Sequence, residues 1–465
     1  MTVIQGYFKF RNVGQGLFYT GMIRDFNFVY DCGVENGTDK DSDLVISAAK
    51  KFRKEVDNYR SIHKLPVSKN PVLDLLVISH FDWDHISGLK ELLTQFNVDT
   101  VIIPYVMPIK RLEVASRSFD KSGEHLIFLK DPVAYFDSYG VRNIVIIGGN
   151  RGNGHINNNN ELVNKENNDN DEEPIKRDIL IAIDELTNDQ EVRDVYEELE
   201  GKDLPDRVNV FFKDSGVISI GYKWEFIFFN YDHTDEMVRK FEKMKSFEGG
   251  SLFDKEKLVR VLSSKKRKLI KREYSRILSS PDMGPNLKND INNTSVILYH
   301  GPVESVSDSR VKGVQIQQKR ALPLFEKVIS HIKKKRKKAL NSFYDFQRSH
   351  FHTTKVCTAL RGTLLMGDIS VQSDFKQIES YFNGKWTNIS VMSVPHHGSK
   401  YNWFSDLLKV VKDGSSMWVV SAGTANKYAH PDPNFIEEIK NHYPEKRLFF
   451  NNELMEITIL TLVIW

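Results

Sequence analysis

Four side chains that bind divalent metal ions fall within six residues, in the segment HFDWDH at positions 80–85. Neutral imidazole and carboxylate groups are both ligands for ions such as Zn²⁺. His80 and Asp82 can point toward one ion, while Asp84 and His85 can point toward a second. Four ligands this close can serve two ions about 3.5–4 Å apart, bridged by hydroxide. The segment therefore predicts half of a two-metal site.

The residues on either side of this segment predict elements that hold its ligands in place. An apolar run from Leu75 to Ile78 precedes it and indicates a buried strand. Residues 87–93 follow it with apolar side chains at helical spacing. Ligands on a loop between two rigid elements keep a fixed geometry, as a metal site requires. We expect a strand, a tight ligand loop and a helix, in this order.

Such a site also needs a carboxylate between the two ions and a histidine from elsewhere in the chain. Asp368 and His396 are the candidates, because each follows an apolar run that predicts a strand. His397 is adjacent, and His430 follows a further apolar run. A single Asp or His at the end of a strand can also be a cap or turn residue. That alternative stays open for Asp368 and for His430.

The composition is that of an ordinary soluble protein with ample apolar material for a core. The chain has 465 residues, of which 40% are hydrophobic and 27% charged, and its net charge of +3 argues neither for nor against nucleic acid. The only cysteines are Cys32 and Cys357. Two cysteines exclude a disulfide scaffold and a cysteine-rich zinc site, and they favour a reducing compartment.

The two ends of the chain predict a cytoplasmic protein without a membrane anchor. Residues 1–11 lack the basic and apolar regions of a secretion signal. Residues 457–465 are apolar but too few to span a bilayer, so they predict a final buried strand. Near the start, the two glycines of residues 12–16 favour a plain hairpin turn over a phosphate-binding loop.

Strands that alternate with helical segments predict an α/β (α+β) protein with insertions. The Gly/Asn/Asp/Glu-rich part of the first insertion cannot bury a core and is expected to be disordered. The expected organisation along the chain is a first half of the α/β domain at 1–108, an Asn-rich, partly disordered insertion at 109–205, core strands at 206–232, a basic helical insertion at 233–289, and a second half of the domain at 290–465 with a basic segment at 319–340.

The segment at 80–85, between an apolar strand and a Gly-Leu helix, resembles the H-x-[HD]-x-D-H motif of the metallo-β-lactamase fold. Within that fold the chain is most similar to the nuclease-like domain of bacterial DNA-uptake (competence) proteins. The likeness covers roughly residues 1–105, 206–232 and 290–465. The residues that carry it are Val13-Gly14-Gln15-Gly16, Asp31-Cys32-Gly33, Asp82 in place of a histidine, Asn293 and Ser295 before an apolar strand, Gly367-Asp368, and Pro395-His396-His397-Gly398-Ser399.

The resemblance implies a four-layer αββα sandwich with a two-metal site at one edge of its sheets and hydroxide attack on a phosphodiester. Asp368 would bridge the ions, Asp84 would also orient the nucleophile, and Asp31 would support the ligand loop. The implied metal ligands are His80, Asp82, Asp84, His85, Asp368 and His396. The residues implied to contact phosphate or to protonate the leaving oxygen are His397, Ser399 and His430.

One feature of many family members has no clear equivalent here. They carry a further histidine between the ligand loop and the Gly-Asp strand, and only His233 and His300 are candidates for it. An extra carboxylate, Asp82, and a missing imidazole make the donor set harder. The expected cofactors are therefore two divalent ions, either Zn²⁺ or Mn²⁺.

Two basic segments indicate the substrate. Runs of Lys and Arg bind phosphate backbones without sequence preference, although either run alone can be a solvated helix face. With Asp82 they favour a nuclease or phosphodiesterase that acts on DNA or RNA. The alternatives are hydrolysis of a thioester, lactone or β-lactam, and a partner-binding component of a bacterial defence system whose insertions dock other proteins. The basic residues are Lys265, Lys266 and Arg267 in one segment and Lys333, Lys334, Lys335 and Arg336 in the other.

Overall fold

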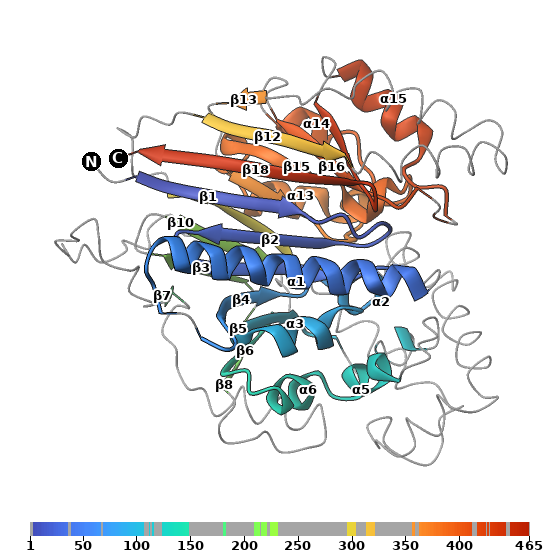
Figure 1. Cartoon of the computed structure of the whole chain (residues 1–465). Helices are drawn as coiled ribbons and strands as arrows, with labels where there is room; N and C mark the ends of the chain where they lie inside the picture. The colour runs from blue at the N-terminus through green and yellow to red at the C-terminus, as the bar shows by residue number, and fades with distance from the viewer. Residues whose placement is uncertain are drawn as a thin grey trace, which may run out of the picture.

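Apolar strands build two large β-sheets that pack face to face, with helices on their outer sides (Figure 1). The computed structural model describes residues 3–35, 39–66, 68–106, 111, 114–115, 123–147, 180–182, 209–213, 215–220, 224–230, 295–303, 313–320, 356–358, 362–411, 416–424, 426, 428–442 and 447–464. The predicted α/β class and the two sheets of the predicted sandwich are confirmed.

The larger sheet has ten strands in the order β13-β12-β18-β1-β2-β3-β4-β5-β6-β8. From β3 to β8 the neighbours run parallel, and from β13 to β3 they run antiparallel. The strands are β1 (Val3–Phe10), β2 (Phe18–Ile23), β3 (Phe26–Cys32), β4 (Val72–Val77), β5 (Asn97–Pro104), β6 (Asn143–Ile147), β8 (Asn209–Lys213), β12 (Gly313–Arg320), β13 (Val356–Thr358) and β18 (Met455–Ile464).

The smaller sheet has eight strands in the order β17-β16-β15-β14-β11-β10-β9-β7. Its strands β14 to β17 are parallel, and the others pair antiparallel. The strands are β7 (Leu180–Ala182), β9 (Ser215–Ile220), β10 (Trp224–Phe229), β11 (Ile297–Pro302), β14 (Gly362–Leu365), β15 (Ile389–Ser393), β16 (Met417–Ser421) and β17 (Leu448–Asn451).

Three clusters of buried side chains separate four layers. One cluster, with Phe52 and Val101, lies between the larger sheet and helices α1, α3, α5 and α6. A second, with Phe28 and Phe226, lies between the sheets. The third, with Trp418, lies between the smaller sheet and helices α13 to α15. The helices are α1 (Asp39–Ile62), α2 (Trp83–Ile86), α3 (Leu89–Gln95), α5 (Glu124–Lys130), α6 (Pro132–Ser138), α13 (Val371–Tyr381), α14 (Leu407–Val410) and α15 (Pro433–His442), with 3₁₀ turns η3 (Trp386–Asn388) and η4 (Pro395–Gly398).

Helix α1 lies along the outer face of the larger sheet because its apolar residues share one face (Figure 1). Val45, Phe52 and Val56 follow helical spacing and are buried. The guanidinium of Arg11, which is 1% exposed, donates to the carboxylate of Glu55 on this helix, with Nη2 and Oε2 2.6 Å apart. This ion pair fixes the helix over the end of β1.

The strand–loop–helix order around the ligand loop is confirmed, with one difference. Strand β4 precedes the loop and helix α3 follows it, but Asp84 and His85 lie in the short helix α2. The predicted final strand is also confirmed as β18, which pairs with β1 and β12. No described helix is both long and apolar enough to cross a membrane.

Part of the stretch predicted as the first insertion joins the layers of the fold. Residues 123–147 form α5, α6 and β6, and β6 pairs in parallel with β5 and β8. The interval 233–289 lies outside the described residues, as does 319–340 beyond the end of β12 at Arg320.

Candidate metal centre

The candidate ligands lie where the carboxyl ends of strands from both sheets meet. His80 is three residues beyond the end of β4 at Val77. Asp368 and His396 are likewise three residues beyond the ends of β14 and β15. Because parallel strands end at one edge of a sheet, the same offset brings these side chains together across the interface between the sheets.

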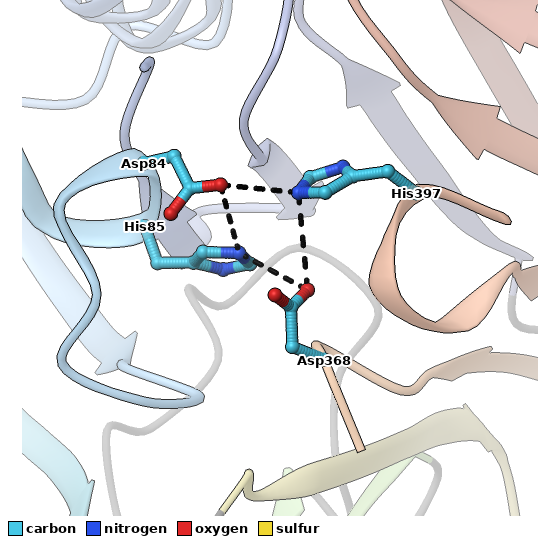
Figure 2. Close-up of side chains that lie close together, drawn as sticks. All are labelled: Asp84, His85, Asp368 and His397. Atoms are coloured by element: carbon cyan, nitrogen blue, oxygen red, sulfur yellow. Dashed lines mark hydrogen bonds and ion pairs between the residues drawn. The ribbon is translucent and has the colours of Figure 1, made fainter. Parts of the chain in front are cut away.

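Four side chains form a compact group (Figure 2), with one ligand atom of each within 4.8 Å of the others: Asp84, His85, Asp368 and His397. We call this the inner cluster. Nε2 of His85 lies 3.3 Å from Oδ1 of Asp368, and Nε2 of His397 lies 3.2 Å from Oδ2 of Asp84. The remaining contacts, His85 with Asp84 and His397 with Asp368, are 3.9 and 3.8 Å. All four groups aim at a common point.

The second oxygen of Asp368 faces a different pair of rings. Its Oδ2 lies 3.5 Å from Nε2 of His80 and 3.6 Å from Nε2 of His396. The carboxylate, which is 3% exposed, therefore stands between two groups of imidazoles, one on each oxygen. This is the position that the sequence assigned to a bridging carboxylate.

Three of these histidines have their outer nitrogen held by the protein. Nδ1 of His85 lies 2.8 Å from a carboxylate oxygen of Asp31, and Nδ1 of His397 lies 2.5 Å from the carbonyl oxygen of Ser421. Both partners only accept, so each Nδ1 carries a proton and each Nε2 faces the centre. Nδ1 of His80 lies 2.9 Å from the hydroxyl oxygen of Ser79. Such outer partners fix the orientation of metal-ligating histidines.

The donor atoms fit a divalent ion. Nε2 of His80 and Nε2 of His85 are buried and have no hydrogen-bond partner among the described residues. A buried polar atom without a partner is costly, by about 1–3 kcal/mol, and requires an explanation. A metal ion would satisfy both atoms, and imidazole nitrogens combined with carboxylate oxygens suit Zn²⁺ and Mn²⁺.

The carboxylates and imidazoles of the centre shift one another's pKa values. Burial alone would raise the pKa of Asp368, but His396, His85, His80 and His397 outweigh it and hold the pKa well below its usual range. Burial lowers the pKa of His85, yet the carboxylates of Asp368, Asp31 and Asp84 raise it well above the ordinary value. The same balance of burial against nearby carboxylates raises the pKa of His397.

The turn at residues 12–16 packs directly behind the ligand loop. The backbone of Leu17 donates to the carbonyl of Asp84 at 3.2 Å. A Cβ on Gly16, whose φ is +143°, would lie 2.7 Å from that same carbonyl oxygen, and one on Gly33 would lie 2.3 Å from the carbonyl carbon. Both glycines thus permit a close backbone contact that holds Asp84, which is a packing role.

Asp82 lies outside the inner cluster. It occupies the N-cap position of α2, and its carbonyl accepts from the backbone N–H of His85 at 3.0 Å. Ser399 is 3% exposed, and its backbone N–H donates to the carbonyl of His396. The ring of His430 lies 5.7 Å from that of His396, and burial, with the charges of His397 and His396, lowers its pKa to about 4.

The distal histidine expected in many family members is not supplied by His300. Its ring packs between the sheets against Phe8, Phe28 and Phe226, and its Nε2 lies 2.9 Å from the hydroxyl oxygen of Tyr19. The other candidate and the basic residues predicted to bind substrate lie outside the described residues. They are His233, Lys265, Lys266, Arg267, Lys333, Lys334, Lys335 and Arg336.

Sequence reasoning missed His125, which supports the ligand loop from α5. Its Nε2 lies 2.9 Å from the carbonyl oxygen of Phe81, and its ring lies 5.2 Å from that of Trp83. The residue falls in the stretch assigned to an insertion, so it was not considered. The apolar spacing of Leu126, Phe128 and Leu129 beside it is the signal that could have placed it on a packed helix.

Comparisons with known proteins give a superfamily match over part of the chain and no substrate. Residues 19–163 match the model of the metallo-beta-lactamase superfamily, a stretch that includes Asp31 and the ligand loop and ends before Asp368. No curated protein matches the chain significantly. Among solved structures the chain is similar to "Crystal structure of a long form RNase Z from yeast", with 8% identity and a TM-score of 0.28, covering 90% of this chain and 37% of that one.

The chain spans only 37% of the length of that structure, so that protein's activity is not transferred to it. The resemblance to the nuclease-like domain of DNA-uptake proteins is not confirmed by these matches and stays a prediction. The superfamily match fits a metal-dependent hydrolase. The chain thus contains a stretch that matches the metallo-beta-lactamase superfamily, and its two sheets with outer helices are consistent with that fold.

Proposed function

We propose that this chain is a metal-dependent hydrolase that cleaves phosphodiester bonds in nucleic acid. The observation that carries the proposal is the Asp368 carboxylate, whose two oxygens face two separate groups of imidazoles. A carboxylate shared in this way suits two ions, and two-metal sites clamp the attacking and leaving oxygens of a phosphoryl group.

In this proposal the inner cluster would hold one ion, and His80 and His396, together with Asp368, would hold another. His397, which the sequence assigned to the phosphate, becomes a ligand, because its Nε2 faces both Asp84 and Asp368. Asp82 as a ligand stays a prediction. Bound Zn²⁺ or Mn²⁺ would supply Lewis-acid polarisation and charge neutralisation at the phosphoryl group.

The residues of the chain then have distinct tasks. Despite its burial, the pKa of Asp84 is held below its usual range by His85 and His397, so its carboxylate is ionised at pH 7 and can accept a hydrogen bond from an attacking water. With a pKa of about 4, His430 is neutral at pH 7. It would therefore donate an N–H hydrogen bond to phosphate rather than release a proton to the leaving oxygen. Ser399 stays a predicted phosphate contact.

Nucleic acid is the favoured substrate because of the two basic segments of the sequence, at residues 265–267 and 333–336. Positive runs neutralise phosphates and release counterions, which gives affinity without sequence preference. An uncharged lactone would gain nothing from such runs.

The test is hydrolysis of single-stranded DNA, RNA and nitrocefin by the full chain with Mn²⁺ or Zn²⁺. We expect cleavage of a nucleic acid, two metal ions per chain by metal analysis, and at least a 100-fold loss of turnover in Asp368→Asn, which keeps the shape but removes the bridging charge. Asp99→Asn, at the surface beside Arg142, is the control and should keep full activity. Hydrolysis of nitrocefin alone, or no cleavage of any nucleic acid with either metal, would contradict the proposal.

A further inference from the structure

A row of aromatic rings leads from the metal centre to the surface. The ring of His396, a neighbour of Asp368, lies 5.7 Å from the ring of His430. The ring of Tyr428 lies 5.8 Å from that of His430 and is nearly parallel to it, at 20°. Tyr428 is 54% exposed. The row therefore ends in an aromatic side chain that solvent can reach.

Exposed aromatic side chains are concentrated at this place. Among the described residues, four large apolar side chains are exposed: Ile62, Ile127, Tyr401 and Tyr428. Both aromatic ones lie on the loops that carry the histidines of the centre. Tyr401, 62% exposed, follows Lys400, whose Nζ lies 4.9 Å from the centre of the Tyr401 ring.

The two loops touch each other beside the centre. The backbone N–H of Asp432 donates to the carbonyl of Gly398 at 2.9 Å. A Cβ on Gly398 would come within 2.6 Å of Pro431. The segments that carry the two tyrosines are thus in contact with each other beside His396 and His430.

The loop that carries Tyr428 is also fixed from within. Oδ1 of Asn426 accepts from the backbone N–H of His430 at 2.9 Å, and its Nδ2 donates to the carbonyls of His430 and Gly423 at 2.8 and 2.7 Å. An exposed ring on a braced loop loses little conformational entropy when a ligand packs on it, which favours binding.

We propose that Tyr428 is a stacking platform for an unpaired nucleobase adjacent to the phosphate at the centre, so that the substrate is a single-stranded nucleic acid. Tyr401 and Lys400 supply a second aromatic face and a positive charge for the same strand. The inference rests on the proposed function and names its substrate class. In a duplex the bases are already paired and stacked, and presenting one to a protein ring costs a few kcal/mol.

The test measures binding without turnover. The full chain, freed of metal with a chelator, is titrated against a fluorescein-labelled 12-nucleotide single strand and against the matched duplex, with anisotropy as readout. Tyr428→Leu, which keeps apolar volume but lacks a π face, should weaken single-strand binding by about 5- to 150-fold, the factor for one stacking contact. Tyr428→Phe should stay within about twofold of wild type, as should the control Ile62→Ala.

Duplex binding should be unchanged in all three variants. Equal single-strand affinity in Tyr428→Leu and wild type would overturn the stacking role. Equal losses of affinity in Tyr428→Leu and Tyr428→Phe would also overturn it, as would a wild type that binds no single strand. Hydrolysis by metal-loaded wild type is read separately. If wild type cleaves nucleic acid but Tyr428→Leu binds normally, only the stacking inference fails. If wild type cleaves none, the proposed function itself fails.

Discussion

Replacing Asp31 with asparagine tests whether the partners behind the ligand loop tune the metal centre. The Asp31 carboxylate is fully buried and accepts three hydrogen bonds. The backbone N–H of Ser79 donates to Oδ1 at 2.7 Å, while the Ser79 hydroxyl and Nδ1 of His85 donate to Oδ2 at 2.6 and 2.8 Å. The φ of Asp31 is +54°, a conformation that asparagine also tolerates. The substitution therefore changes chemistry rather than backbone.

The expected loss of metal affinity in Asp31→Asn follows from these hydrogen bonds. An asparagine has one accepting oxygen and one donating amide, so in its better orientation it keeps two of the three hydrogen bonds and loses the charge. A hydrogen bond to a charged group contributes ~1.5–3 kcal/mol, which corresponds to about 10- to 150-fold. Changes to such outer partners cost about 10- to 100-fold in metal affinity. We expect Asp31→Asn to bind Zn²⁺ or Mn²⁺ roughly 10- to 100-fold more weakly.

The assay is competition with a chromophoric chelator at pH 7.5, for wild type, Asp31→Asn and Asp25→Asn. Asp25 is a buried aspartate between β2 and β3, away from the ligand loop, so its substitution should leave metal affinity within about twofold. Unchanged affinity in Asp31→Asn would refute the reasoning. An equal loss in Asp25→Asn would show that the effect is a general loss of stability.

Two further predictions concern stability and binding. Burial lowers the pKa of His300 to about 3, whereas in the unfolded chain it titrates near 6.5. The unfolded state therefore binds the proton first, and the free energy of unfolding should fall by about 2 kcal/mol between pH 7.5 and pH 5. Urea titrations of His300→Gln at the two pH values should lack this fall in the free energy of unfolding. The same fall in His300→Gln and wild type would assign it to other titrating groups. Replacing residues 333–336 with glutamine should lower the magnitude of the slope of log K against log salt for single-strand binding by roughly 3. An unchanged slope would show that this run is a solvent-exposed face that does not contact the nucleic acid.

The sequence predicted the features of the centre that depend on local pattern. An apolar run followed by a polar residue marked the ends of β4, β14 and β15, and His80, Asp368 and His396 do lie at those ends. It made only His396 a ligand and assigned His397 to the phosphate, whereas the rings of both face Asp368. Both adopt left-handed φ values, 44° and 55°, and their rings point to different oxygens of Asp368. That arrangement depends on an unusual backbone conformation, which residue type does not reveal.

The sequence pattern also did not predict the long-range packing around β6 and α5. The apolar run at 143–147 lies just before a Gly/Asn-rich stretch, and the predicted insertion at 109–205 includes both. In the fold this run is β6, because β5 and β8 offer it hydrogen-bond partners on both sides. The support of the loop by His125 likewise depends on α5 packing beside Phe81. Local composition does not contain such partners, since they come from distant parts of the chain.

The separation of the ligands along the chain has a consequence for how the centre is assembled. Asp84 and His397 meet although they are 313 residues apart. A contact between such distant residues forms late in folding, because the loop-closure entropy must be overcome first. During synthesis, the inner cluster cannot be completed until the ribosome has passed residue 397 and the second sheet has docked on the first. A metal ion at this place would join the two sheets, so its uptake would report that the whole sandwich has closed.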